Sequence, residues 1–333
     1  MEHMPTSRPK ALVTAALSGP GLVLLGELAD LVIDSWLDQP TLRIYNAEQL
    51  AERVAAEGAN IVIVESDQCG GALFERDEPL IAVCSCRGDP NNVDVAAATA
   101  AGVPVLRAPG RNADAVAELA IALLFAANRR VIAADKDVRA GEIYKDGTIP
   151  YQRFRAWELA GKTAGLVGLG AVGRALRWRL QGLGIEVLAY DPYAPDATSS
   201  FEELLAKSDI ISIHTPVTEE TSGMIGADAF AKMRDGVIFI NTARAKVHDP
   251  DALVAALTSG KVSAAGLDHF EGEFLDPAHP LTTFDSVVLT PHIGGATYDT
   301  ESNHTKTIAD DLCRILAGAR PVNIVNPEVL DSR

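Results

Sequence analysis

Gly168-Leu-Gly170-Ala-Val-Gly173 directly follows the aliphatic run Thr163–Val167 and precedes Arg174–Leu183, which has the composition of a helix. In a strand–turn–helix unit the first glycine permits the tight turn, the second lets a pyrophosphate approach the backbone, and the third lets helix and strand pack closely. The N-terminus of this helix then faces the phosphate charge, and Ala171 and Val172 are among the predicted cofactor contacts. We therefore predict a dinucleotide-binding site, although a lone glycine triplet also fits an ordinary strand-to-helix turn.

Asp191 lies eighteen residues after Gly173, at the end of the next predicted strand. A carboxylate in this position can bind both ribose hydroxyls of an adenosine and would repel a 2′-phosphate. The neighbouring Pro192 and Tyr193 supply no arginine that could attract such a phosphate. The sequence therefore favours NAD over NADP as the cofactor.

Strand-like and helix-like segments alternate along the chain, which is typical of parallel α/β sheets. In the first third, Ala47–Glu57 is a predicted helix, and the predicted strands are Ala11–Ala15, Leu42–Tyr45, Asn60–Val64, Leu80–Cys84 and Val103–Leu106. After the turn-rich break Gly141–Pro150, six strands are predicted: Thr163–Val167, Glu186–Tyr190, Ile210–His214, Val237–Asn241, Val262–Gly266 and Val287–Leu289. Their spacing of roughly 23 to 27 residues is that of βα units, so we predict two doubly wound parallel sheets.

Two long helices are predicted around the second set of strands. One begins at Asn112, a suitable N-cap residue, with Asp114 complementing the helix dipole, and continues to Val138. The other, Thr300–Ala317, follows the last strand and could pack against the first sheet.

The length of 333 residues predicts two domains, and 47% apolar with 22% charged residues is ordinary globular composition. A net charge of −16 argues against nucleic acid or an anionic membrane as a partner, so a small molecule is expected. Four cysteines and seven histidines show no zinc-type spacing, so no metal site is expected. Because Met1–Lys10 lacks an apolar signal core and the longest apolar run, Leu119–Ala127, cannot span a bilayer, we expect a cytoplasmic protein.

A second group of polar residues follows three later strands: Arg244 after Val237–Asn241, Asp268 and Glu273 after Val262–Gly266, and His292 after Val287–Leu289. The carboxyl ends of strands in one sheet share an edge, where ligands of open α/β sheets bind. Taken singly, Arg244 also fits a surface ion pair, Glu273 a solvated carboxylate and His292 an ordinary loop histidine. Together they offer a consistent set of groups. Arg244 has a planar fork of donors for a carboxylate, His292 is of a residue type that titrates near neutral pH, and Glu273 can fix the tautomer of that histidine.

Several motifs occur in order between about Ala82 and His304: Asn92-Val-Asp94, Asn112-Ala-Asp-Ala-Val-Ala-Glu118, Leu159-Ala-Gly-Lys-Thr-Ala-Gly-Leu-Val-Gly-Leu-Gly-Ala-Val-Gly173, Asp191-Pro192, His214-Thr215-Pro216, Asn241-Thr242-Ala243-Arg244, Gly266-Leu-Asp268 and Pro291-His-Ile-Gly-Gly295. With this series the chain resembles the D-isomer-specific 2-hydroxyacid dehydrogenases. That group includes D-3-phosphoglycerate dehydrogenase, D-lactate dehydrogenase and glycerate or hydroxypyruvate reductases.

The resemblance implies a role for each matching position. Arg244 would grip the carboxylate and keto oxygen of the substrate, His292 would donate and accept the proton, and Glu273 would orient that histidine and tune its protonation. Asp268 would contact the nicotinamide end of the cofactor. Further implied cofactor contacts are His214, Thr215, Pro216, Thr242, Ala243 and Gly294, and further implied substrate contacts are Arg87, Gly88 and Asn112. The helix that starts at Asn112 resembles the arm that builds a homodimer through the NAD-binding domain.

The resemblance also implies a flavodoxin-like substrate domain, residues 1–110 and 296–333, with a Rossmann NAD-binding domain, residues 111–295, inserted into it. The substrate loop usually reads Arg-x-Gly-x-Gly-x-Asp-Asn, but this chain has Ser85, Arg87, Asp89 and Asn91 at the first four specified places. Asp89 would disfavour a phosphorylated substrate tail and Arg87 would favour one, so these residues predict opposite preferences. Ala245 replaces the family glycine after Arg244.

The sequence thus suggests reversible NAD-linked oxidation of a small D-2-hydroxy acid to its 2-keto acid, of the glycerate/hydroxypyruvate or phosphoglycerate type. The main alternative is a non-enzymatic NAD-sensing scaffold or corepressor of the same fold, which would bind the dinucleotide with little turnover. Formate dehydrogenase shares the scaffold but pairs its histidine with a glutamine, so Glu273 argues against it.

Overall fold

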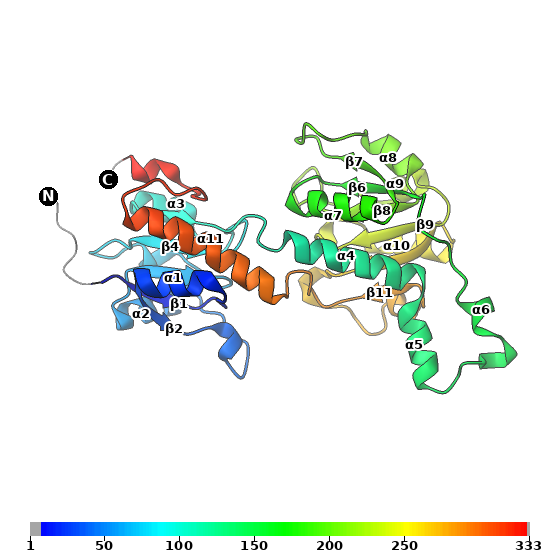
Figure 1. Ribbon diagram of the computed structural model, residues 1–333, viewed down its shortest axis with the longest axis horizontal. Helices are drawn as coiled ribbons and strands as arrows, with labels where there is room; N and C mark the ends of the chain where they lie inside the picture. Colours follow the sequence, from blue (N-terminus) through cyan, green and yellow to red (C-terminus); the bar gives the residue numbers. More distant parts are fainter. Residues whose placement is uncertain (1–7, 332–333) are drawn as a thin grey trace. The chain divides into compact units, whose positions relative to one another are not determined.

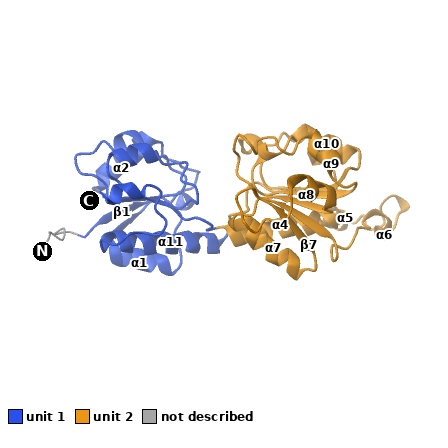
Figure 2. Ribbon diagram, turned by 90° about the horizontal axis from the view of Figure 1, so that it is seen from above, with its two compact units in different colours: residues 1–111, 297–333 blue, residues 112–296 orange. Residues whose placement is uncertain are grey.

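The structure is a computed structural model that describes residues 8–331, in which the chain forms two compact units (Figure 1; Figure 2). Unit 1 consists of the chain up to Arg111 and from Thr297 onward, and unit 2 is Asn112–Ala296. These boundaries differ by one residue from those predicted from the sequence. Of the N-terminal stretch Met1–Lys10, residues 1–7 lie outside the described part.

Unit 1 contains a five-stranded parallel sheet in the order β2-β1-β3-β4-β5. The strands are β1 (Lys10–Val13), β2 (Asp30–Ile33), β3 (Ile61–Val64), β4 (Ala82–Ser85) and β5 (Val105–Leu106). The inner strands are apolar and buried, as expected for a parallel sheet covered on both faces. Helices α1 (Pro20–Leu28) and α11 (Tyr298–Leu316) cover one face, and α2 (Ala47–Glu57) and α3 (Val95–Ala100) cover the other (Figure 2).

Local signals determine the bounds of α2. Asn46 accepts a hydrogen bond from the backbone N–H of Gln49, whose side chain in turn accepts from the N–H of Asn46. This capping box satisfies backbone donors that the first turn leaves free. The helix ends at Gly58, whose φ of 61° lies in the left-handed region. Between these ends, Leu50 and Val54 are buried one turn apart and attach the helix to the sheet.

Unit 2 contains a six-stranded parallel sheet in the order β11-β10-β9-β8-β6-β7. The strands are β6 (Thr163–Val167), β7 (Glu186–Tyr190), β8 (Ile210–Ile213), β9 (Val237–Asn241), β10 (Val262–Leu267) and β11 (Val287–Leu289). Helices α4 (Ala113–Asn128) and α7 (Ala171–Gly182) cover one face, and α8 (Phe201–Lys207), α9 (Ala227–Lys232) and α10 (Pro250–Thr258) cover the other (Figure 2). The predicted fold class, two parallel α/β sheets, is confirmed.

The strand order of unit 2 places its loops where they can form a site. β6 lies between β7, which follows it in sequence, and β8, so the chain reverses its direction of growth across the sheet at β6. Connections after β6 and β8 therefore diverge to opposite faces and leave a crevice at the carboxyl ends of these strands. The glycine-rich turn that follows β6 lies at this point.

Two predicted elements are wrong in detail. The segment Leu42–Tyr45 forms no strand, because Asp30–Ile33 pairs with β1 and occupies that edge of the sheet. Leu42–Tyr45 instead makes side-chain contacts: Arg43 and Tyr45 both bond the Asp34 carboxylate. An alternating apolar pattern cannot distinguish such a loop from a short edge strand.

The long helix predicted from Asn112 to Val138 is two helices. α4 ends at Asn128, and α5 (Val131–Arg139) begins after Arg130, whose φ of 51° is incompatible with a continuous helix. α5 and the short α6 (Pro150–Arg153) extend away from the sheet of unit 2 (Figure 1). Asn112 occupies the N-cap position as predicted, but its side chain does not cap the helix.

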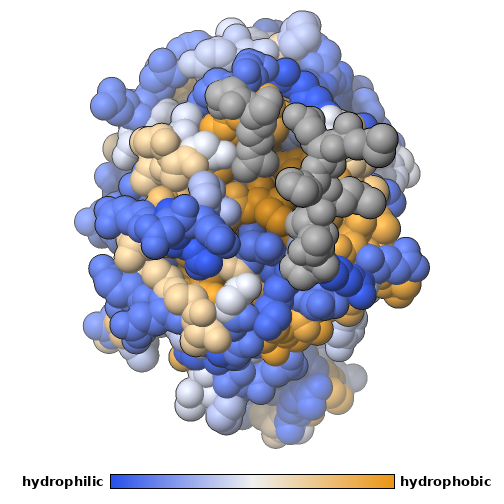
Figure 3. Space-filling view, turned by 90° about the vertical axis from the view of Figure 1, so that its left-hand side faces the viewer, coloured by the Kyte–Doolittle hydropathy of each residue, from blue (hydrophilic) through white to orange (hydrophobic). Residues whose placement is uncertain are grey.

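Within residues 8–331, no helix combines the length and apolar character needed to cross a membrane. The face of unit 1 seen in Figure 3 is mainly hydrophilic, with smaller hydrophobic areas between the polar residues. This distribution agrees with the excess of acidic residues in the chain.

We predict opposite effects for two glycines of α1. A Cβ on Gly21 would lie 2.6 Å from the backbone nitrogen of Lys306 in α11, whereas a Cβ on Gly26 would meet no atom within 4 Å. Gly21→Ala should lower the free energy of unfolding by roughly 1–3 kcal/mol through overpacking. Gly26→Ala should raise it by roughly 0.5–1 kcal/mol because alanine is the better helix former. Urea unfolding measures both, and a Gly21→Ala protein as stable as Gly26→Ala would contradict this packing.

Candidate active site

The three glycines after β6 have three different surroundings. Gly168 has a φ of 99°, and a Cβ there would lie 2.7 Å from the carbonyl carbon and oxygen of His214. A Cβ on Gly173 would overlap the carbonyl oxygen of Gly168. Gly170, in contrast, has no atom within 4 Å of a Cβ position. The first and third glycines therefore permit close packing, and the second faces open space that a pyrophosphate can occupy.

A cavity of about 500 Å³ adjoins this turn. Its lining residues include Gly168, Gly170, Asp191, Tyr193, His214, Thr215 and Pro216. Asp191 accepts hydrogen bonds from the backbone N–H groups of Leu169 (2.8 Å) and Tyr193 (2.9 Å), which hold the carboxylate beside the cavity. The described lining also contains Glu219 and Glu220 but no lysine or arginine. The acidic lining disfavours the 2′-phosphate of NADP and is compatible with NAD.

Two buried polar atoms near the predicted cofactor contacts have no partner among the described residues: Nδ1 of His214 and Oγ1 of Thr242. Burial lowers the pKa of His214 to about 4, so its imidazole is neutral at pH 7. Its Nε2 lies 2.8 Å from Oγ of Ser212, which leaves Nδ1 for another partner. Because unpaired buried polar atoms are costly, a bound cofactor that reaches them would stabilise the site. These residues fit NAD.

The turn after β9 presents Arg244 to solvent. Asn241 is buried, accepts a hydrogen bond from the N–H of Ala243 and donates one to the carbonyl oxygen of Arg244, each 2.9 Å long. These two bonds determine the shape of the turn, so the exposed guanidinium of Arg244 leaves the sheet at a defined place. A planar fork of donors in this position can bind a carboxylate in bidentate fashion.

Asp268, at the end of β10, is fully buried and organises the loop after β11. One carboxylate oxygen accepts from Oγ1 of Thr290 (2.6 Å) and the N–H of Ile293 (2.9 Å), and the other accepts from the N–H of Gly294 (2.8 Å). The backbone N–H of His292 also donates to the carbonyl oxygen of Asp268, at 2.9 Å. The position of His292 therefore depends directly on Asp268.

His292 and Glu273 form a pair with 2.9 Å between Nδ1 and Oε1. Their side chains are 44% and 61% exposed, so a small molecule can reach them. A carboxylate only accepts, so the contact requires a proton on Nδ1 and leaves Nε2 to take up or release a second proton. Both residues have a φ of 55°, which is uncommon for residues other than glycine and typical of functional sites.

His269 was missed by the sequence analysis. It is only 6% exposed, and its ring centroid lies 3.8 Å from that of His292. Its pKa is lowered to about 4, chiefly by burial and then by the charges of His292 and Arg244. A signal was present, because His269 directly follows Asp268 at a strand end, but a single histidine there does not indicate that it meets His292.

The remaining predicted substrate residues lie in different places. Asn112 is in unit 2, where its Nδ2 would be 3.1 Å from a Cβ on Gly295, three residues after His292. Arg87 and Gly88 are in unit 1 after β4, where the carbonyl oxygen of Arg87 accepts from the N–H of Ala108 at 2.8 Å. Their action together with Arg244 and His292 stays a prediction.

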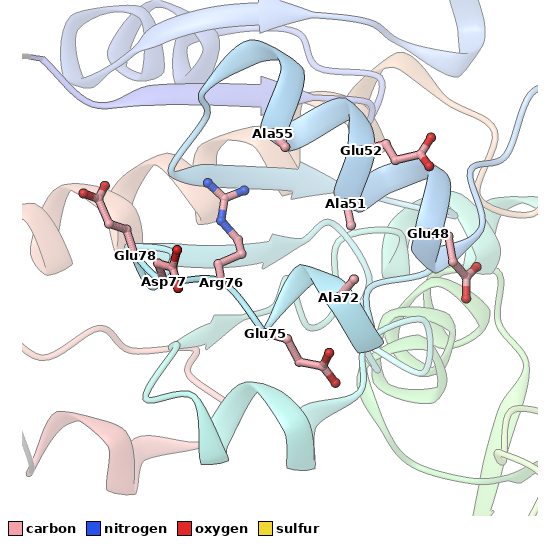
Figure 4. Close-up of a pocket in the computed structure, with 9 residues that line it drawn as sticks. All are labelled: Glu48, Ala51, Glu52, Ala55, Ala72, Glu75, Arg76, Asp77 and Glu78. Carbon is pink, nitrogen blue, oxygen red and sulfur yellow. The ribbon is translucent and has the colours of Figure 1, made fainter.

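Unit 1 also has a cavity, of about 710 Å³, between α2 and the loop that contains Arg76 (Figure 4). Its charged lining is Glu48, Glu52, Glu75, Arg76, Asp77 and Glu78. Figure 4 shows that these side chains spread over the helix and the loop and do not converge on one point. Five carboxylates against one guanidinium would repel a dinucleotide or a keto acid, so this cavity does not suit either ligand.

We predict that acid destabilises unit 2 through its buried histidines. Burial lowers the pKa of His214 and of His248 to about 4, whereas an unfolded histidine titrates near 6.5. Between these values the unfolded chain binds more protons, so stability falls as pH falls. Each histidine should contribute about 2 kcal/mol of lost stability between pH 7 and pH 5. Urea unfolding at both pH values should show a smaller loss for His214→Gln; an equal loss would contradict the prediction.

Comparisons of the sequence with known proteins identify the family that the chain is similar to. Residues 121–294 match the family model of the NAD-binding domain of D-isomer specific 2-hydroxyacid dehydrogenases. A glyoxylate reductase of Thermofilum pendens is 37% identical over 336 residues, which cover 98% of this chain and 97% of that protein. A D-3-phosphoglycerate dehydrogenase of Archaeoglobus fulgidus is 42% identical over 244 residues, 71% of this chain and 45% of that protein.

Solved structures show the same similarity. The TT0316 protein of Thermus thermophilus aligns with a TM-score of 0.80 and 33% identity, over 95% of this chain and 99% of that chain. A putative D-isomer specific 2-hydroxyacid dehydrogenase of a Polaromonas species aligns with a TM-score of 0.83 and 28% identity, over 96% of this chain and 100% of that chain. From its sequence and its fold, the chain therefore belongs to the D-isomer-specific 2-hydroxyacid dehydrogenases, a family of NAD-dependent oxidoreductases.

Proposed function

We propose that the enzyme interconverts a small D-2-hydroxy acid and its 2-keto acid with Arg244, Glu273 and His292 as catalytic residues. The observation that carries this proposal is the contact between His292 and Glu273, 2.9 Å long and accessible to solvent. NAD supplies the hydride chemistry when bound, and the protein supplies position and charge. Arg244 binds the substrate carboxylate and polarises the keto oxygen. His292 takes the hydroxyl proton on oxidation and returns it on reduction.

Glu273 makes this proton transfer efficient in two ways. It holds the imidazole with Nδ1 protonated, so Nε2 has the lone pair needed to accept the hydroxyl proton. Its negative charge then stabilises the imidazolium that forms. The left-handed backbone at both residues indicates that the surrounding loops hold the pair in one geometry, although this conformation is unfavourable for each residue alone.

The substrate we favour is small and unphosphorylated, such as glyoxylate or hydroxypyruvate. The relative from Thermofilum pendens, named glyoxylate reductase, aligns over nearly its whole length with this chain. In the substrate loop, Asp89 would repel a phosphorylated tail, and Arg87 would attract it. A panel of glyoxylate, hydroxypyruvate, pyruvate and phosphohydroxypyruvate with NADH tests this choice. Turnover of phosphohydroxypyruvate alone would reverse it, and turnover of none would favour the scaffold alternative.

We also infer a homodimer through unit 2. The arm formed by residues 131–157, which includes α5 and α6, exposes the apolar side chains of Val131, Ile132, Val138, Tyr151 and Trp157. An exposed apolar group of this kind marks a protein–protein contact.

Four free cysteines, three of them buried, support a reducing compartment such as the cytoplasm.

Ile132→Asp combined with Val138→Asp should convert the dimer to a monomer, because two buried carboxylates in an apolar interface would lack partners. Light scattering coupled to size-exclusion chromatography measures the molar mass. Val322→Asp, at an apolar residue of unit 1 that is somewhat more exposed, is the control and should remain dimeric. A wild-type chain that elutes as a monomer would contradict the inference.

His292→Ala should lower turnover by roughly 10²-fold or more, the usual scale for a lost general acid/base, while NADH still binds. Glu273→Gln should lower it less, because the glutamine can still contact the imidazole but carries no charge. Steady-state rates with the keto-acid panel and NADH fluorescence titration give both quantities. Unchanged turnover in His292→Ala would exclude the proposed role of His292.

A further inference from the structure

The proposed catalytic pair and one neighbouring histidine can bind one metal ion together. His269, Glu273 and His292 each offer a ligand atom, and these atoms lie within 4.8 Å of one another. Two imidazoles and one carboxylate are a common donor set for zinc and other transition metals. The spacing of the three residues in sequence matches no zinc motif, because His292 comes from the loop after β11 and the other two from the loop after β10.

His269 is the unusual member of this set. It is only 6% exposed, yet neither ring nitrogen has a hydrogen-bond partner among residues 8–331. A ring nitrogen with no hydrogen-bond partner keeps its lone pair available, so the imidazole can bind an ion that reaches it from solvent.

The other two ligands are accessible and already close to the required spacing. Nδ1 of His292 and Oε1 of Glu273 are 2.9 Å apart. Two ligands about 2.0–2.1 Å from a tetrahedral zinc ion lie roughly 3.3 Å from each other, so a small movement of these exposed side chains would admit the ion. Both side chains are exposed enough for an ion to enter from solvent.

The charges around His269 act in both directions. The guanidinium of Arg244 opposes a cation, whereas the carboxylates of Asp268 and Glu273 favour one. Asp268 is held by three hydrogen bonds from the loop after β11 and is not free to serve as a ligand. The balance predicts a site of moderate affinity, which an anionic substrate bound at Arg244 would alter.

We propose that His269, Glu273 and His292 form a transition-metal site at which Zn²⁺ binds and blocks the enzyme reversibly. The ion displaces the proton from Nδ1 of His292 and binds this nitrogen and the Glu273 carboxylate. The imidazole then carries its one proton on Nε2, so His292 cannot accept a proton from the substrate. The inhibition rests on the proposed catalytic role of His292, but the binding of the ion does not.

Equilibrium dialysis of the full-length chain against Zn²⁺ tests the site without turnover. We expect one ion per chain with micromolar affinity. His269→Phe keeps an aromatic ring against His292 and removes one ligand, so affinity should fall at least roughly 10-fold. His279→Phe removes another histidine of unit 2 that lies outside the set and should leave affinity unchanged. Mg²⁺, which prefers oxygen ligands, should not compete.

Inhibition is measured separately, as the rate of NADH oxidation with increasing Zn²⁺ and its recovery with EDTA. Each variant is compared with its own rate without metal, and His269→Phe should need at least roughly 10-fold more Zn²⁺ for half inhibition. NADH fluorescence shows whether His269→Phe is folded, and Glu273→Gln replaces it if it is not. The proposal is overturned if the wild-type chain binds no Zn²⁺ at concentrations about 100-fold above the micromolar range. It is also overturned if His269→Phe and Glu273→Gln both bind Zn²⁺ as tightly as the wild-type chain. If the chain binds Zn²⁺ as expected but turns over no keto acid, the proposed function fails and the metal site stands.

Discussion

The buried carboxylate of Asp268 is the group on which the candidate active site depends. Asp268 directly follows β10 and accepts three hydrogen bonds from Thr290, Ile293 and Gly294, all in the loop after β11. A buried charge is tolerated only when it is well paired, so this loop cannot move away without leaving the charge unsatisfied. His292 lies between the bonded residues and is thereby held in its left-handed conformation, next to Glu273.

A second constraint is the close approach of backbones at the switch point of the unit 2 sheet. Gly168 packs against the backbone at His214, and Gly173 packs against Gly168, so the turn after β6 lies tightly on the loop after β8. Of these three glycines, Gly170 alone faces open space, beside the cavity lined by Asp191.

The net charge of −16 cannot attract an anionic dinucleotide or keto acid. In the function proposed above, binding therefore rests on local features, namely the N-terminus of α7 at Ala171 and the guanidinium of Arg244.

The accuracy of the sequence-based predictions follows from the kind of signal behind each. Strands of unit 2 are mainly apolar runs of three to six residues bounded by turns, and each lies where the sequence predicts it to within one residue. The short edge strand Asp30–Ile33 was missed because only one partner strand holds it and its residues are partly exposed. The break at Arg130 was missed because nothing in the local composition excludes a helix there; a single left-handed residue causes it.

The sequence by itself determined the α/β fold class, the dinucleotide turn and the identity of the candidate residues Arg244, Glu273 and His292. These features depend on local spacing and on the rule that carboxyl ends of parallel strands share one edge. Only the tertiary structure decided which side chains meet there. It brought His269 against His292 and left its ring nitrogens without partners among the described residues, although 23 positions separate the two residues in the chain. Side-chain contacts between loops depend on how the whole sheet is ordered, which no local pattern encodes.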